Sequence, residues 1–136
     1  MKSIVLYDRY EQHNKQAVKL HQKLIDDCKK MIEGNGKLAG VFIDNCNRKV
    51  PLEKRSGYSA MREMCRNNNI DEVYVTSMSR LNRDIKCIIN MCRDMHGYGI
   101  KVNFVNENVT SEQMINSSAI KQIIDGAEQE IHGQCL

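Results

Sequence analysis

The chain has 136 residues, of which 41% are hydrophobic and 27% are charged, and its formal net charge is +3. These values are typical of one globular domain that buries its own core, and they exclude a disordered or fibrous chain. No apolar run approaches the ~18 residues that a membrane span needs, and the N-terminus lacks the pattern of a signal peptide. We therefore expect a cytoplasmic protein with no membrane partner. The mild positive charge allows a nucleic-acid partner without predicting one.

The first half of the chain alternates between strand and helix patterns. Ser3 to Tyr7 is a short apolar run of strand length, and Leu38 to Ile43 is a second. Between them, apolar residues recur at helical spacing from Ala17 to Ile32, and Gly34-Asn35-Gly36 ends that helix. Asn45 to Ser56 is a polar, basic loop.

The second half continues this alternation. A short helix at Tyr58 to Cys65 precedes a third strand at Glu72 to Thr76. A helix from about Asn82 to Met95 leads to a fourth strand at Ile100 to Val105. The last segment, residues 110–132, opens with a capping box and is a long helix. This order predicts an α/β fold with a central, mostly parallel sheet of four or five strands flanked by helices.

The last helix carries apolar residues over nearly six turns. That stripe is longer than a small domain needs to cover its sheet, so we expect the helix to mediate oligomerisation. Residues 1–136 form one domain in this interpretation, and none of them resembles a second domain that reads DNA sequence.

The cysteines and histidines lack the spacing of metal ligands. The sequence has six cysteines and no Cys-x-x-Cys motif, and its four histidines are scattered. We expect reduced thiols, no metal and no small-molecule cofactor.

Arginines follow three strands of the predicted sheet. Arg9 follows the first strand, Arg55 lies in the loop after the second, and Arg80 and Arg83 follow the third. Because the carboxyl ends of parallel strands meet at one edge of a sheet, these side chains could converge there. Arginine presents a planar fork of donors that fits phosphate oxygens, so a nucleic-acid phosphodiester is the natural ligand. The alternative is that each arginine is a separate solvated surface charge.

The order of these motifs resembles the catalytic domain of serine site-specific recombinases, the resolvase/invertase family, and especially the large serine recombinases of phages and mobile elements. Tyr7-Asp8-Arg9 resembles the first motif of the family, and Arg80-Leu81-Asn82-Arg83 resembles the third. Asp44 and the segment Leu52 to Tyr58 resemble the region between them. The likeness extends from residue 3 to about residue 131.

The resemblance implies site-specific DNA recombination, in which a serine attacks a phosphodiester without metal or ATP. It implies DNA as the partner of a homodimer that becomes a tetramer in the synaptic complex. The residues implied to stabilise the phosphate are Arg9, Arg55, Arg80 and Arg83. Gln22 lies where the first helix of the family carries a glutamine. Arg48 and Lys49 are candidates for contact with the DNA backbone.

The chain departs from the family pattern where the chemistry should occur. The nucleophile position, two residues after Arg9, holds Glu11. The aspartate before the third motif is Ser79, and residues 44–49 lack the glycines and the serine of the second motif. A glutamate is a poor nucleophile whose charge repels phosphate, so we expect Glu11 to pair with the arginines and cleavage to be impaired.

Three interpretations remain open at this point. The chain is a recombinase catalytic domain, active or not. Alternatively, it is a non-catalytic homologue that binds DNA or recombinase subunits. In the third interpretation it is an anion-binding or nucleotide-binding module that shares only the layout of the fold.

Overall fold

The computed structural model describes residues 1–116, in which five strands form one sheet. They are β1 (Ser3–Tyr10), β2 (Lys37–Asn45), β3 (Glu72–Val75), β4 (Lys101–Phe104) and β5 (Val109–Thr110). Their order across the sheet is β2-β1-β3-β4-β5. The first four are parallel to their neighbours, and β5 is antiparallel to β4. The expected mostly parallel sheet is confirmed.

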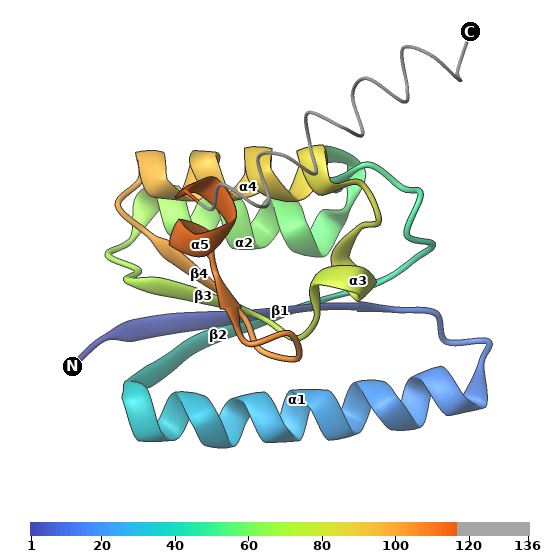
Figure 1. Cartoon of the computed structure of the whole chain (residues 1–136). Coiled ribbons are helices and arrows are strands. Elements are labelled where there is room, and N and C mark those ends of the chain that lie inside the picture. Colours follow the sequence, from blue (N-terminus) through green and yellow to red (C-terminus); the bar gives the residue numbers. More distant parts are fainter. Residues whose placement is uncertain (117–136) are drawn as a thin grey trace, which may run out of the picture.

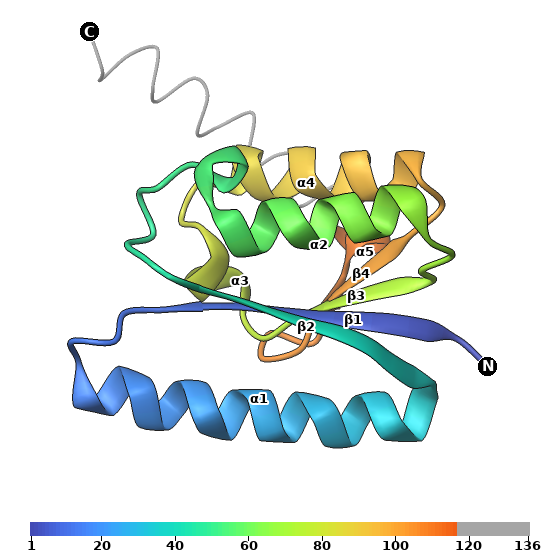
Figure 2. The same ribbon diagram turned by 180° about the vertical axis from the view of Figure 1, so that it is seen from behind.

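Helices cover both faces of this sheet. They are α1 (Lys15–Asn35), the 3-10 helix η1 (Leu52–Lys54), α2 (Ser56–Asn67), the short α3 (Met78–Leu81), α4 (Ile85–Gly97) and α5 (Ser111–Asn116). α1 lies alone on one face, whereas α2, α4 and α5 lie on the other (Figure 1). The view from behind shows the same two helical layers with the sheet between them (Figure 2). The α/β architecture expected from the alternating pattern is therefore correct.

β1 is buried on both faces and separates two apolar clusters. Val5 and Tyr7 belong to the core beneath α2 and α4. Ile4 and Leu6 pack in a smaller cluster with the inner residues of α1. Because successive strand side chains point to opposite faces, Asp8 lies on the α1 side, as its contact with that helix confirms.

The helix expected from Asn82 to Met95 begins three residues later, at Ile85, and a separate short helix, α3, precedes it. α3 ends at Leu81, and the Asn82 side-chain oxygen accepts a hydrogen bond from the Asp84 N–H at 2.8 Å. Asp84 then caps α4 by accepting from the Lys86 N–H at 3.0 Å. Short polar side chains that bond to nearby backbone favour turns and caps over a continuous helix. Arg83 consequently lies between the helices and not in the first turn of a helix.

The first strand is longer than its apolar run. β1 continues to Tyr10 because its pairing with β2 continues, with Arg9 opposite Asp44 and Tyr10 opposite Asn45. Arg9 therefore lies in a strand, not in the loop expected from the sequence.

The predicted capping box is confirmed at the start of α5. The Gln113 side chain accepts from the Thr110 N–H at 2.9 Å, and the Thr110 hydroxyl accepts from the Gln113 N–H at 3.3 Å. Most of the predicted long helix, residues 117–132, lies outside the described residues. The oligomerisation expected of that helix stays a prediction.

Residues 1–116 include no helix long and apolar enough to cross a membrane. Within the same range, no group of three or more histidine, cysteine or acidic side chains could hold a metal ion. The cysteines of this range, at positions 28, 46, 65, 87 and 92, are free thiols.

Candidate functional site

The site lies at the carboxyl ends of β1, β2 and β3, where the arginines gather. Arg9 belongs to β1, Arg55 precedes α2 and Arg80 belongs to α3. Burial lowers the pKa of the Arg9 guanidinium, and the charges of Arg55 and Arg80 lower it further. The structure thus brings these three side chains into electrostatic contact. Arg83 is exposed at the periphery.

Arg55 is the most buried of the arginines, with 2% of its surface exposed. Its Nε donates to the Val50 carbonyl and its Nη2 to the Arg48 carbonyl, both at 3.0 Å. Its Nη1 lies 3.5 Å from the Tyr7 hydroxyl oxygen. Each of its nitrogens therefore has a protein partner. Arg55 holds the loop that carries Arg48 and Lys49, and it is not a solvated surface charge.

Asp44 organises the opposite end of the same network. It accepts hydrogen bonds from the Tyr7 hydroxyl at 2.7 Å and from the Gly57 and Tyr58 N–H groups at 2.8 Å. Because Arg55, the N-cap residue of α2, has no side-chain oxygen, Asp44 supplies the cap from β2. A Cβ at Gly57 would lie 2.8 Å from Asp44 Oδ2, so glycine permits this approach. Burial raises the pKa of Tyr7 far above its ordinary value, which keeps the hydroxyl a donor.

Arg9 links β1 to both neighbouring loops. Its Nε donates to the Arg80 carbonyl, and its Nη1 donates to the Cys46 carbonyl at 2.6 Å. Nη1 also lies 3.5 Å from Glu11 Oε1, and the exposed fractions of these side chains are 7% for Arg9 and 29% for Glu11. Glu11 Oε2 lies 3.3 Å from His13 Nε2 as well. The pairing of Glu11 with an arginine, expected from the sequence, is present.

Arg80 is bound in a bidentate manner by Asp8. The Nε–Oδ1 and Nη2–Oδ2 distances are both 3.3 Å. Asp8 is 1% exposed, and it also contacts His21 Nδ1 and accepts a hydrogen bond from the Thr76 hydroxyl. The Tyr10 ring stacks on the His21 ring at a centroid distance of 4.0 Å. The side chains of Arg80, His21 and Thr76, from α3, α1 and the end of β3, thus meet at one buried carboxylate.

Sequence reasoning missed Asp8 and His21 as members of the site. It selected Gln22 on α1, but the structure places Gln22 on the exposed side of the helix and His21 on the buried side. One residue on a helix corresponds to a rotation of about 100°. The available signal was an acidic residue, Asp8, directly after an apolar run, because a charge that is buried requires a partner.

Glu107, in the turn between β4 and β5, is a further residue that the sequence did not indicate. Its carboxylate accepts from the Met78 N–H at 2.8 Å and from the Ser77 hydroxyl at 3.0 Å. The Ser77 and Ser79 hydroxyl oxygens lie 3.0 Å apart. Glu107 therefore fixes the start of α3, the segment that carries Arg80.

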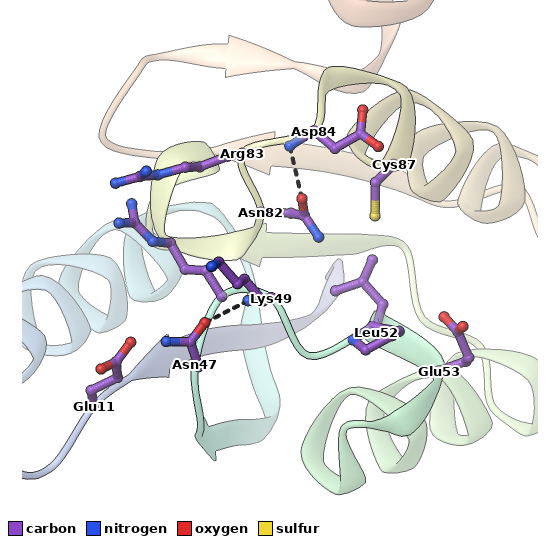
Figure 3. A pocket seen from close by; sticks show the side chains of 11 residues that line it. Glu11, Asn47, Lys49, Leu52, Glu53, Asn82, Arg83, Asp84 and Cys87 are labelled. Atoms are coloured by element: carbon purple, nitrogen blue, oxygen red, sulfur yellow. Dashed lines mark hydrogen bonds between the residues drawn. The ribbon is translucent and has the colours of Figure 1, made fainter. Parts of the chain in front are cut away.

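Two hollows open beside this cluster. The smaller, of about 290 Å³, is lined by Arg9, Tyr10, Glu11, Asn14, Ala17, Arg48 and Arg80. The larger, of about 650 Å³, is lined by Glu11, Asn47, Arg48, Lys49, Pro51, Leu52, Glu53, Asn82, Arg83, Asp84 and Cys87. Lys49 and Arg83 lie on the Glu11 side of the larger hollow, with Leu52, Glu53 and Cys87 opposite (Figure 3). Glu11 and Arg48 line both hollows and so form the boundary between them.

The smaller hollow has the chemistry of an oxyanion site with one negative group at its edge. Arg9 Nη2 and Arg80 Nη1 make no hydrogen bond to any residue within 1–116, and both side chains line this hollow. Guanidinium donors in a partly buried site bind phosphate or carboxylate oxygens strongly. The Glu11 carboxylate at the same wall opposes such an anion.

Comparison with known proteins identifies the family of the chain and its fold. A family model of the resolvase N-terminal domain matches residues 4–132. The chain is similar in structure to the N-terminal catalytic domain of TP901-1 integrase, with 19% identity, a TM-score of 0.74, and coverage of 96% of this chain and 98% of that one. No curated protein matches the sequence.

Two further solved structures share the fold. One is a resolvase family site-specific recombinase from Streptococcus pneumoniae, with 16% identity, a TM-score of 0.75, and coverage of 99% of this chain and 93% of that one. The other is the C-terminal catalytic domain of ISC1926 TnpA, an IS607-like serine recombinase, with 16% identity, a TM-score of 0.65, and coverage of 96% and 99%. The family match over nearly the whole chain argues against a module that shares only the layout of the fold. The chain belongs to the resolvase family and has the fold of a serine recombinase catalytic domain.

Proposed function

We propose that this chain is a site-specific DNA recombinase domain that binds DNA phosphates but is impaired in DNA cleavage. The observation that carries the proposal is the Arg9–Glu11 pair, with 3.5 Å between Nη1 and Oε1. The resemblance implies a serine at position 11. Here the side chain at that position offers no hydroxyl and instead occupies a donor of the phosphate-binding arginine.

Phosphate binding is supported by the arrangement of the basic side chains. Arg9 and Arg80 line the smaller hollow, and each has a guanidinium nitrogen that makes no hydrogen bond to residues 1–116. Arg48, Lys49 and Arg83 continue the basic surface along the larger hollow. An inner anion site with basic residues beside it suits a phosphate and its neighbours in a nucleic-acid backbone.

Impaired cleavage follows from the charge of Glu11 as well as from the missing hydroxyl. A carboxylate about 4 Å from a phosphate raises the free energy of the complex by about 1 kcal/mol where the groups are hydrated, and the Glu11 side chain is 29% exposed. The nearby Ser77 and Ser79 hydroxyls bond to each other, and Ser77 also bonds to Glu107. Neither serine lines the smaller hollow, so neither is placed to replace the missing nucleophile.

A second candidate function is a non-catalytic homologue that binds DNA or recombinase subunits. The same Arg9–Glu11 pair favours it, because a site without a nucleophile can still hold a backbone phosphate. In both candidates the partners are DNA and further copies of the chain, as a homodimer or as a tetramer in a synaptic complex. Sedimentation of the full chain with and without a duplex measures that assembly.

Two measurements on the full chain test the proposal. Fluorescence anisotropy with a short labelled duplex should show binding that weakens steeply between about 50 and 200 mM salt. Incubation with nicked duplexes of randomised sequence should yield no adduct that survives detergent. A covalent adduct from the unaltered chain would refute impaired cleavage, and absence of binding at low salt would refute phosphate recognition.

Matched variants separate the nucleophile from general charge effects. Glu11→Ser restores a hydroxyl beside Arg9, and we expect it to gain the adduct that the unaltered chain lacks. Glu33→Ser removes the same charge from an exposed position near the end of α1, and we expect it to form no adduct.

A further inference from the structure

We propose that Asp8, held in place by His21 and Thr76, is a positioning residue that orients Arg80 for phosphate binding. The inference deepens the proposed function and rests on it, because it concerns the same smaller hollow. It assigns roles to two side chains, Asp8 and His21, that lie behind the arginines and do not line that hollow.

The geometry of the Asp8–Arg80 pair determines which guanidinium nitrogen remains free. Asp8 accepts hydrogen bonds from Arg80 Nε and Nη2, each at 3.3 Å. Arg80 Nη1 then makes no hydrogen bond to residues 1–116. A bidentate pair fixes the plane of the guanidinium as well as its position. Since Arg80 lines the smaller hollow and its side chain is 14% exposed, the fixed plane directs Nη1 toward the hollow.

Asp8 is in turn held by groups that have no access to a bound phosphate. His21 Nδ1 contacts one of its oxygens, and the Thr76 hydroxyl donates to the other. The Tyr10 ring stacks on His21 with an interplanar angle of 11° and limits movement of the imidazole. A site residue whose supporting side chains are themselves fixed loses less freedom when its ligand binds.

A simple charge argument gives the opposite role to Asp8. A carboxylate near a guanidinium cancels part of its positive charge, so removing it should strengthen the binding of any anion. Positioning predicts that removing it weakens binding, because Arg80 would then sample several orientations. The two roles therefore differ in the sign of one measured change. The 1% exposure of Asp8 favours positioning, because a phosphate cannot approach the buried carboxylate.

The experiment measures the affinity of the full chain for a short labelled duplex by fluorescence anisotropy. We expect Asp8→Asn to bind about fivefold more weakly than the unaltered chain. Asp26→Asn is the matched control, because it removes the same charge from an exposed position on α1, and it should bind equally well or slightly more tightly. In an Arg80→Gln background, Asp8→Asn should produce no further loss, because Asp8 acts through Arg80.

The outcomes distinguish this inference from the proposed function. If the unaltered chain does not bind the duplex, both fail. If it binds and Asp8→Asn binds equally or more tightly, only the positioning role of Asp8 is refuted. An equal loss in the Arg80→Gln background would also refute it, because the effect would not depend on Arg80.

A second variant decides the matter if Asp8→Asn does not fold, as judged by circular dichroism. His21→Asn keeps the Asp8–Arg80 pair but removes the imidazole that holds Asp8. We expect it to weaken duplex binding two- to threefold, with no effect in the Arg80→Gln background. Unchanged affinity in a folded His21→Asn variant would overturn the proposal.

Discussion

Two carboxylates three residues apart, Asp8 and Glu11, each pair with an arginine of the same site, yet their surroundings differ. The Asp8 side chain is fully buried and has three protein partners, whereas the Glu11 side chain is 29% exposed and lines both hollows. A buried carboxylate of this kind is part of the framework that holds an arginine. One at the rim competes with the ligand for that arginine. Whether the carboxylate is buried or exposed therefore decides whether it supports the arginine or competes with the ligand.

Asp44 extends the comparison to a second buried carboxylate, and its removal should have the largest effect on stability. Asp44→Ala leaves the Tyr7 hydroxyl and the first N–H groups of α2 without their acceptor. We expect the free energy of unfolding to fall by about 3 kcal/mol, the sum of a lost helix cap and a buried unpaired donor. Urea denaturation measures it. Asp26→Ala, on the exposed face of α1, should change it by less than about 0.5 kcal/mol, and a similarly small change for Asp44→Ala would contradict a framework role.

Gly57→Ala tests the same contact between Asp44 and the start of α2 by changing the residue on the helix. A methyl group there would lie 2.8 Å from Asp44 Oδ2, so the carboxylate must shift away from the cap. We expect a loss of about 1–3 kcal/mol in the free energy of unfolding. Gly34→Ala is the control, because a Cβ there meets no atom of the described residues within 4 Å and alanine favours the helix. If both variants were equally stable, close packing at Gly57 would be disproved.

Arg83 is an exposed residue at the edge of the larger hollow. Its substitution should alter DNA binding and leave the free energy of unfolding unchanged. Arg83→Gln removes one exposed charge from the larger hollow. The slope of log affinity for duplex DNA against log salt should become less steep by about 0.9, as expected for one lost phosphate contact. Arg66→Gln, in the last turn of α2, is the control and should leave the slope unchanged. Equal slopes for both variants would place the DNA elsewhere.

The buried cysteine thiols provide a further test of burial, with the smallest expected effect. Burial raises the pKa of Cys28 and Cys92 to about 12 and that of Cys65 to about 11, above the ordinary value of 9.0. Because the unfolded chain releases these protons more readily, this contribution to stability is present below about pH 9 and is lost as pH rises toward 12. At pH 8, a thiol reagent should label these three cysteines only after unfolding. Rapid labelling in the folded chain would show that these thiols are accessible to solvent and contradict their burial.

Much of the fold could be predicted from the sequence because local patterns determine it. Apolar periodicity gave the order of strands and helices, and the Thr110–Gln113 capping box was confirmed. The gathering of Arg9, Arg55 and Arg80 followed from the parallel sheet, since the ends of neighbouring strands meet at one edge. The start of α4 at Ile85 instead of Asn82 was missed because it depends on side-chain hydrogen bonds to the backbone, not on hydrophobic spacing.

The interior of the site could not be predicted for a different reason. The charge of Asp8 next to an apolar run indicates that it needs a partner, but the sequence does not indicate that the partner is His21 on α1. The burial of Arg55 likewise depends on the path of the loop whose carbonyls it binds. Such partners are far apart in the chain, so the spacing of residues in the sequence does not predict their contact.

The most direct test of the account is the duplex affinity of Glu11→Gln, which keeps the size of the side chain and removes its charge. If Glu11 competes with phosphate for Arg9, this variant should bind a short labelled duplex about fivefold more tightly, or about 1 kcal/mol. Glu33→Gln, with the same change of charge far from the site, should gain much less. Equal gains for the two variants would contradict the central claim that the glutamate at position 11 blocks a working phosphate site.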